Sequence, residues 1–134
     1  MALQDAYPCV VVKAVPTDTA TTDGASVDIP YTGKGYVVRA VYFYNSRILS
    51  TGATANNATA TLGVFGASGG SSPTIVADAA LTTHTGSTIV SSRTVAATGT
   101  TPLVTAKTLY IRTGTASGVT GSGVDVIIEY SVLP

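Results

Sequence analysis

The chain has 134 residues, a length that predicts one domain able to bury about two thirds of the surface that the unfolded chain exposes. Only 10% of the residues are charged, and the seven basic and seven acidic side chains cancel, so electrostatics favour neither nucleic acid nor an anionic membrane as a partner. The chain is rich in Ala, Thr, Gly, Ser and Val and poor in strong helix formers, which argues against a helical protein.

Residues 1–8, MALQDAYP, are predicted to form a short extended arm before the first strand, and residues 9–134 a single domain. Asp5 comes early, and no basic region precedes a long apolar stretch. The arm therefore does not resemble a secretory signal, and we expect synthesis in the cytoplasm. No run approaches the roughly 18 apolar residues that a membrane span requires, so no membrane partner is expected.

The single cysteine, Cys9, opens the first apolar run. One cysteine excludes an internal disulfide, and no cluster of Cys and His is present that would hold zinc. The apolar neighbours favour a small buried side chain over a reactive thiol.

Alternating apolar residues between turn-forming stretches predict about eight strands at intervals of about 10–18 residues, and hence an antiparallel β-sandwich or barrel. In chain order the predicted strands cover residues 9–15, 26–31, 36–45, 59–65, 74–77, 88–95, 108–113 and 124–132. The pattern is weakest at 74–77, where a short helical turn over 73–81 is also predicted, with Ser72 as its cap and Pro73 in its first position.

Two of these strands have a strong period of two. In YVVRAVYFYN, one face would carry Tyr36, Val38, Ala40, Tyr42 and Tyr44, and the other Val37, Arg39, Val41 and Phe43. Both faces are largely apolar, which indicates a central strand covered on both sides, or a strand with one face against a partner. In VDVIIEYSV, one face would carry Val124, Val126, Ile128, Tyr130 and Val132, and the other, a wet face, Asp125, Ile127, Glu129 and Ser131.

The stretch GASGG at residues 66–70 matches G-x-S-x-G, the motif that presents a nucleophilic serine in α/β-hydrolases. Asp78 and His84 follow Ser68 in the order of such a triad. Hydrolases, however, bring these partners from separate strands far along the chain, and no alternation of strands and helices supports that fold. We interpret GASGG as a turn, expect no catalytic residue, and place His84 in a solvated loop rather than in a base or ligand role.

Three aspartates, Asp18, Asp23 and Asp28, are spaced by five residues. A calcium loop needs carboxylates at alternate positions and a closing glutamate, so turn-forming and strand-capping roles are the better interpretation. The basic residues are scattered along the chain, which predicts no nucleic-acid patch. We expect no metal site and no cofactor.

The seven tyrosines, with two Phe and no Trp, favour side chains that have an apolar body and a polar tip. The predicted row on residues 36–45 is consistent with a sandwich core whose hydroxyls reach the rim, with a subunit interface, or with a sugar-binding platform. The residues that we single out as a candidate interface are Leu3, Tyr7, Tyr36, Tyr42 and Tyr44.

The C-terminal stretch KTLYIRTGTASGVTGSGVDVIIEYSV, the earlier strand GYVVRAVYFYNS and the arm MALQDAYP together resemble the small jelly-roll virion proteins of tailed bacteriophages. The resemblance covers most of the chain and implies a jelly-roll-like β-sandwich. It further implies a non-enzymatic decoration, or cement, protein that sits as a homotrimer on the capsid surface of the virion and ties neighbouring major capsid proteins together. The resemblance implies no individual binding residue.

Two other functions are left open by the sequence. Jelly rolls also serve as lectins, so the chain is alternatively a carbohydrate- or receptor-binding module of a phage tail fibre or other appendage. The third possibility is a small hydrolase that uses Ser68.

Overall fold

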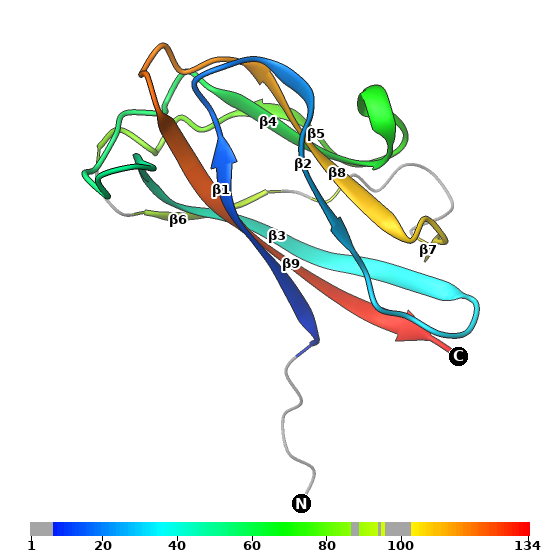
Figure 1. Cartoon of the computed structure of the whole chain (residues 1–134). Coiled ribbons are helices and arrows are strands. Elements are labelled where there is room, and N and C mark those ends of the chain that lie inside the picture. Colours follow the sequence, from blue (N-terminus) through cyan, green and yellow to red (C-terminus); the bar gives the residue numbers. More distant parts are fainter. Residues whose placement is uncertain (1–6, 87–88, 94, 96–102) are drawn as a thin grey trace, which may run out of the picture.

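The computed structural model describes residues 7–86, 89–93, 95 and 103–134. Within these residues the chain forms strands, one short 3-10 turn and connecting loops, so the predicted all-β fold is confirmed (Figure 1). The strands are β1 Cys9–Pro16, β2 Thr21–Asp28, β3 Gly35–Ile48, β4 Thr61–Ala67, β5 Ser71–Ala80, β6 Val90–Arg93, β7 Leu103–Val104, β8 Thr108–Thr115 and β9 Ser122–Leu133, and the 3-10 turn η1 is Ser68–Gly70.

The strands form two antiparallel sheets that pack face to face (Figure 1). One sheet has the order β1-β9-β3-β6, with the short β7 also pairing with β3, and the other has the order β2-β8-β4-β5. The pairing is nested, because β1 pairs with β9, β2 with β8, β3 with β6 and β4 with β5. A chain doubled back on itself and rolled into two sheets in this way is a jelly roll, as the resemblance implied.

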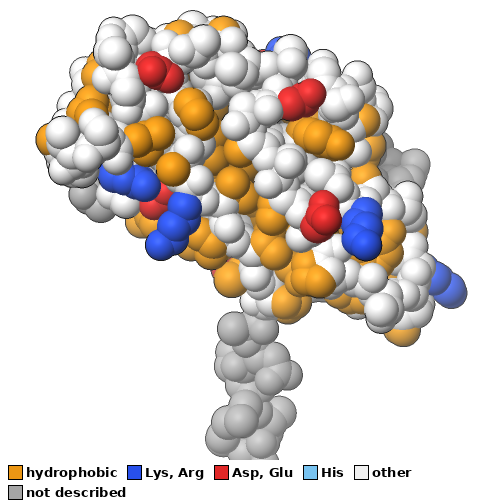
Figure 2. Space-filling view, viewed as in Figure 1, with side chains coloured by type: hydrophobic (Ala, Val, Ile, Leu, Met, Phe, Trp, Pro, Cys, Tyr) orange, Lys and Arg blue, Asp and Glu red, His pale blue; other side chains and the backbone are white. Residues whose placement is uncertain are grey.

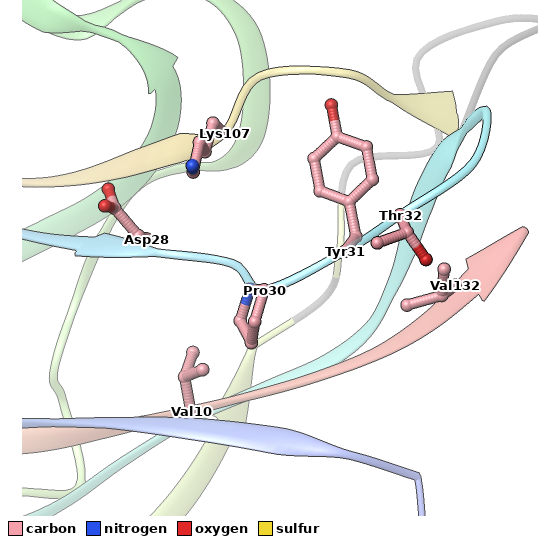
Figure 3. Close-up of a pocket in the computed structure, with 7 residues that line it drawn as sticks. All are labelled: Val10, Asp28, Pro30, Tyr31, Thr32, Lys107 and Val132. Atoms are coloured by element: carbon pink, nitrogen blue, oxygen red, sulfur yellow. The ribbon is translucent and has the colours of Figure 1, made fainter.

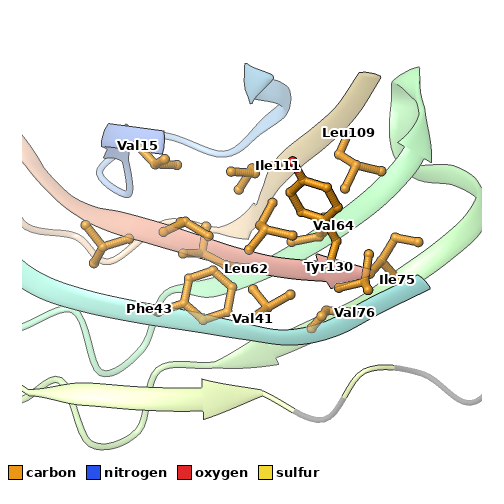
Figure 4. Close-up of a cluster of buried hydrophobic side chains, with 14 of the residues drawn as sticks. Val15, Val41, Phe43, Leu62, Val64, Ile75, Val76, Leu109, Ile111 and Tyr130 are labelled. Carbon is orange, nitrogen blue, oxygen red and sulfur yellow. The ribbon is translucent and has the colours of Figure 1, made fainter. Parts of the chain in front are cut away.

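The core lies between the two sheets and is built from the inward-facing residues of both (Figure 4). The largest side chains that are fully buried there include Tyr36, Phe43, Leu62, Leu109, Ile111 and Ile128. In β9, Val124, Val126, Ile128 and Tyr130 all point inward, as the alternation predicted. Burying aliphatic and aromatic side chains of this size stabilises the fold by roughly 1.5–3 kcal/mol each, before the entropy of ordering the chain is subtracted.

The predicted helical turn over 73–81 is wrong, because this segment is the strand β5. Ile75 and Val76 are buried in the core, and β5 pairs along its length with β4. Branched side chains favour strands, and here they also gain a cross-strand partner, which outweighs the helix-starting signal at Ser72 and Pro73. The second strand also differs from its prediction, because β2 begins at Thr21, inside the stretch that we expected to be a turn.

A polar cluster is buried at the end of the sandwich where β1, β3 and the loop between β8 and β9 meet. Asn57, which is fully buried, donates from Nδ2 to Ser46 Oγ at 2.6 Å and to the Gly123 carbonyl at 3.3 Å. Its Oδ1 accepts a hydrogen bond from Thr17 Oγ1 at 3.0 Å, and that hydroxyl also lies 2.9 Å from Ser122 Oγ. These contacts satisfy buried polar groups and fix how the loops close this end of the sandwich.

Candidate functional site

Ser68 lies in an exposed turn, as we predicted for GASGG. Residues Ser68–Gly70 form η1 between the paired strands β4 and β5. Gly69 and Gly70 have φ angles of 75° and 68°, a left-handed conformation that glycine adopts without steric cost. The amide of Gly69 donates to Asp23 Oδ1 at 3.0 Å, so the turn is tied to β2.

His84 is buried, with no exposed surface, so its predicted place in a solvated loop is wrong. The segment before β6 folds back on itself, because the His84 amide donates to the Leu81 carbonyl at 2.8 Å and the His84 carbonyl accepts from the Asn57 amide at 2.8 Å. The ring Nε2 lies 2.8 Å from Ser91 Oγ on β6. The backbone pairing of this segment buries the His84 ring. The turn-like composition of TTHTG does not reveal that pairing.

Asp78 forms an ion pair on the outer side of the β2-β8-β4-β5 sheet. Its Oδ2 accepts a hydrogen bond of 2.9 Å from Arg112 Nε on β8. A Cβ at Gly63 or at Gly114 would collide with the Asp78 carboxylate, so these two glycines let that side chain lie flat across the strands. The three residues of the triad-like motif therefore have different neighbours: Ser68 is in the turn, His84 contacts Ser91, and Asp78 pairs with Arg112.

The three N-terminal aspartates hold separate parts of the fold. Asp18 Oδ2 accepts from the Gly121 amide at 2.9 Å, Asp23 binds the Gly69 amide, and Asp28 Oδ1 accepts from Thr108 Oγ1 at 2.6 Å. Each aspartate therefore links its own segment to a distant one, whereas turn-forming and strand-capping roles were predicted. Among the described residues, no group of His, Cys, Asp or Glu is placed to hold a metal ion.

The predicted tyrosine row is interrupted, because β3 contains an extra residue. Val38 pairs with Tyr130, but Ala40 already pairs with Glu129, so Arg39 is inserted between them. An inserted residue inverts the side-chain alternation beyond it. Tyr36 therefore points into the core, whereas Tyr42 and Tyr44 point outward, and the prediction that they share one face is wrong.

Tyr36 is a core residue with a satisfied hydroxyl. It has no exposed surface, and its hydroxyl donates to the Ala106 carbonyl at 2.6 Å. The Tyr130 ring meets it edge-on at 6.0 Å, and the Tyr31 ring lies tilted at 5.1 Å. Burial, with a smaller contribution from Tyr31, raises the pKa of the Tyr36 hydroxyl well above its ordinary value. The position excludes Tyr36 from direct contact with a partner, as long as the sandwich stays folded.

The two remaining interface candidates, Leu3 and Tyr7, precede β1 in the sequence. Tyr7 is 50% exposed, and its ring centroid is 5.1 Å from the Arg39 guanidinium carbon, a cation–π distance. Arg39 in turn donates from Nε to Ser131 Oγ at 3.0 Å. Leu3 lies outside the described residues. Cys9 is exposed, so its predicted burial is wrong: its side chain falls on the outward parity of β1, while Val10 and Val12 face the core.

The outer side of the β1-β9-β3-β6 sheet carries a largely apolar set of side chains. Register places Val11, Ile127 and Tyr42 in one row across β1, β9 and β3, and Tyr44 beside Val90 across β3 and β6. We call this surface the apolar sheet face, and its members are Cys9, Val11, Val37, Ala40, Tyr42, Tyr44, Val90 and Ile127. Val11 is 45% and Val90 is 65% exposed, and Glu129 and Ser131 lie among these residues as polar neighbours. In the sequence, this surface was indicated by the apolar residues on both faces of the strand predicted at 36–45.

A buried carboxylate lies at one end of the same side, where a wet face was predicted. Asp125 on β9 is only 3% exposed. It accepts hydrogen bonds from the Ala14 amide at 2.9 Å and from Asn45 Nδ2 at 3.1 Å, and it pairs with Arg47 at 3.0 Å. Burial disfavours the ionised form of Asp125, but these three donors outweigh it, so the pKa of the carboxyl lies below its usual value.

An open groove of about 730 Å³ lies beside β1, at the opposite end of the sandwich from the buried polar cluster (Figure 3). It is lined by Val10, Asp28, Pro30, Tyr31, Thr32, Lys107 and Val132. Figure 3 shows Val10 and Pro30 facing each other, with Asp28 and Lys107 at one end and Thr32 and Val132 at the other. The Tyr31 hydroxyl donates a hydrogen bond of 2.5 Å to the Thr105 carbonyl, which holds the ring in place. Sequence reasoning missed this groove because its walls come from four separate segments.

Within the residues that the structure describes, no helix is long and apolar enough to cross a membrane. Comparison of the chain with protein-family models, with curated proteins and with solved structures found no match.

Proposed function

We propose that this chain is a non-enzymatic structural protein of a bacteriophage virion, a decoration protein that binds the outside of the capsid shell and stabilises contacts between major capsid proteins. The observation that carries the proposal is the apolar sheet face, which presents aliphatic and tyrosine side chains on the outside of a rigid jelly roll. The proposal includes self-association into a homotrimer.

The outward side of a sheet that packs on one core is normally polar, because only one side of an antiparallel sheet needs to be covered. Here Val11 and Val90 are 45% and 65% exposed, and Tyr42 and Tyr44 lie half-buried between them. Contiguous apolar surface of this kind marks protein-interaction sites. Tyrosine suits such a site, since its ring supplies contact area and its hydroxyl tolerates water before the partner binds.

The placement of the triad-like residues supports a role that is not enzymatic. Ser68 sits in an exposed turn, whereas His84 Nε2 lies 2.8 Å from Ser91 Oγ and the Asp78 carboxylate accepts a hydrogen bond from Arg112. A nucleophile mechanism requires the base within hydrogen-bond reach of the serine and oriented by the acid.

The test is binding to purified shells that lack any decoration protein. We expect the protein to co-sediment with such shells and to raise their melting temperature by several degrees. Tyr42→Lys should weaken binding at least tenfold, because it places a charge in the centre of the apolar sheet face. Ser26→Lys, which adds the same charge to an exposed position of the other sheet, is the matched control and should bind normally.

Equal binding by both variants would contradict the assignment of the apolar sheet face, and failure of the unmodified protein to bind any shell would contradict the function. Circular dichroism of both variants checks that each is folded.

The groove is the observation that favours a second candidate, a carbohydrate- or receptor-binding module. Apolar walls with a few polar groups at the ends are typical of small-ligand sites, and the volume of about 730 Å³ lies within their usual range. Binding to a glycan array that is lost in Tyr31→Ala and retained in Tyr42→Lys would support this candidate over the decoration protein.

A further inference from the structure

The first half of β1 is an open sheet edge. β1 pairs with β9 on one side and is the last strand of its sheet on the other. The Tyr130 amide donates to the Pro8 carbonyl at 3.0 Å, and the pairing with β9 stays in register from Cys9 to Val12, so residues 8, 10 and 12 direct their backbone groups at β9. Backbone direction alternates along a strand, so Cys9 and Val11 direct their N–H and C=O groups away from the sheet.

The two halves of this edge differ in their protection. Natural edges are shielded by lysine, proline and bulges. The second half of β1 has all three, namely Lys13, the bulge at Ala14 and Pro16. The first half, from Cys9 to Val12, has none of them, and Val11 is 45% exposed.

The groove lies directly beside the unprotected half. Val10 lines it from β1, and Pro30, Tyr31 and Val132 form the rest of its apolar wall. In the space-filling view, hydrophobic side chains gather in this region, next to one acidic and one basic side chain (Figure 2). A strand added to the free edge would place every second side chain in the groove, since residues opposite Val10 share its inward direction.

Tyr7 and Pro8 of the same protomer lie on the side of β1 away from its free edge. Tyr7 packs on Arg39 of β3, and the Pro8 carbonyl is bound to β9, so the chain enters β1 from the side of β9 and β3 and not from the free edge. We therefore take an arm that occupies this groove to come from another copy. Six extended residues span about 20 Å, which is enough to cross between neighbouring subunits.

The sequence of residues 1–6 matches the groove in its alternation. In an extended conformation Met1, Leu3 and Asp5 share one side. The apolar pair corresponds to the apolar wall, and the carboxylate corresponds to Lys107, for which the described residues supply no ion pair within 4.0 Å. We propose that residues 1–6 of one copy add as a strand to the free edge of β1 in a second copy, with Leu3 in the groove.

This inference rests on the proposed homotrimer but not on binding to a shell. In the proposed homotrimer, a head-to-tail exchange in which each copy gives its arm to the next closes into a ring of three, with every arm paired and every β1 edge covered. Each arm contributes backbone hydrogen bonds along Cys9 and Val11 and buries Leu3, and three such links reinforce one another.

Mass measurement by light scattering tests the exchange. We expect three protomers for the full chain and one for a variant that lacks residues 1–6 but keeps Tyr7 and Pro8. Val132→Lys, which puts a charge in the groove, should also give a monomer. Ala77→Lys is the control, since it adds the same charge at an exposed apolar position on β5 of the other sheet, and should stay trimeric.

A peptide of residues 1–8 added to the truncated protein locates the contact. We expect hydrogen exchange at the Cys9 and Val11 amides to slow at least tenfold, and a Leu3→Asp peptide to have no such effect. A full chain that is monomeric, a truncated chain that keeps the full mass, or a saccharide that binds the groove while the full chain stays monomeric would overturn the inference. Shell binding is scored separately: a trimer that ignores shells contradicts the shell-binding part of the proposed function and leaves this inference standing. A monomer that binds shells contradicts the homotrimer, and with it this inference, but leaves the shell-binding part standing.

Discussion

The Asp125 carboxylate on β9 binds both neighbouring strands, β1 and β3, at positions where each strand bulges. Ala14 of β1 and Asn45 of β3 have φ angles of 60° and 58°, which non-glycine residues rarely adopt. Both lie at bulges, and both donate a hydrogen bond to the Asp125 carboxylate of β9. For alanine the left-handed conformation costs roughly 1–2 kcal/mol. The carboxylate therefore offsets strain that β1 and β3 would otherwise carry alone.

Asp125→Asn should destabilise the fold by about 3 kcal/mol, because it leaves the Arg47 charge, 18% exposed, without its partner. The measurement is urea unfolding at neutral pH. Asp28→Asn is the control: that carboxylate is exposed and binds a single hydroxyl, so the change should cost about 0.5 kcal/mol or less. Equal losses in the two variants would show that Asp125 has no special role.

The same residue predicts a dependence of stability on pH. Its pKa is lower in the folded protein than the ordinary value of 3.8, so the folded state favours the ionised form. The contribution is fully present above pH 3.8 and is lost as the pH falls through the folded pKa. The difference in unfolding free energy between the unmodified protein and Asp125→Asn should thus be constant at neutral pH and shrink below about pH 4. A difference that stays constant into strong acid would contradict this account.

At the scale of elements, β3 shows what alternation predicts and what it does not. The period of two located the strand, and the apolar character of both parities indicated that its outer side meets something. The extra residue at Arg39 could not be recognised in the sequence, because Val and Tyr occur at both odd and even positions around it. Which tyrosines face outward was therefore not predictable from the pattern.

Deletion of Arg39 tests the function of this bulge. Without the extra residue, the segment from Ala40 onward either turns its outer side to the core or pulls Tyr36 out of it. We expect a loss of more than about 4 kcal/mol and no cooperative unfolding transition. Arg39→Ala removes only an exposed side chain and should melt within a few degrees of the unmodified protein. A stable deletion variant would mean that the strand tolerates either register.

Other differences between sequence and structure also come from contacts between distant segments. Cys9 looked like a core residue because its neighbours are apolar, yet its position relative to β9 turns it outward. His84 looked like a loop residue, but backbone pairing with Asn57 buries it. The groove joins residues 10, 28–32, 107 and 132, a juxtaposition that no local pattern encodes.

At the scale of the whole molecule, the two sheets present different exteriors. The β1-β9-β3-β6 sheet carries the apolar sheet face. The outer side of the other sheet includes the Arg112–Asp78 ion pair, with Arg112 5.5 Å from the Phe65 ring centroid. The proposed function accordingly assigns the apolar sheet face to the side that lies against the capsid shell.

The nested pairing also sets the order in which a growing chain can fold. All four strands of the β2-β8-β4-β5 sheet are available once Thr115 has been synthesised. β9, which lies between β1 and β3, begins only at Ser122, so until residues 122–133 are made β1 lacks its partner in the sheet and β3 has only β6 and β7 beside it. Pairing between such distant segments folds slowly, on a scale of milliseconds to seconds. A ribosome stalled before Ser122 would therefore carry a half-finished sandwich with bare hydrophobic strands, a natural substrate for chaperones.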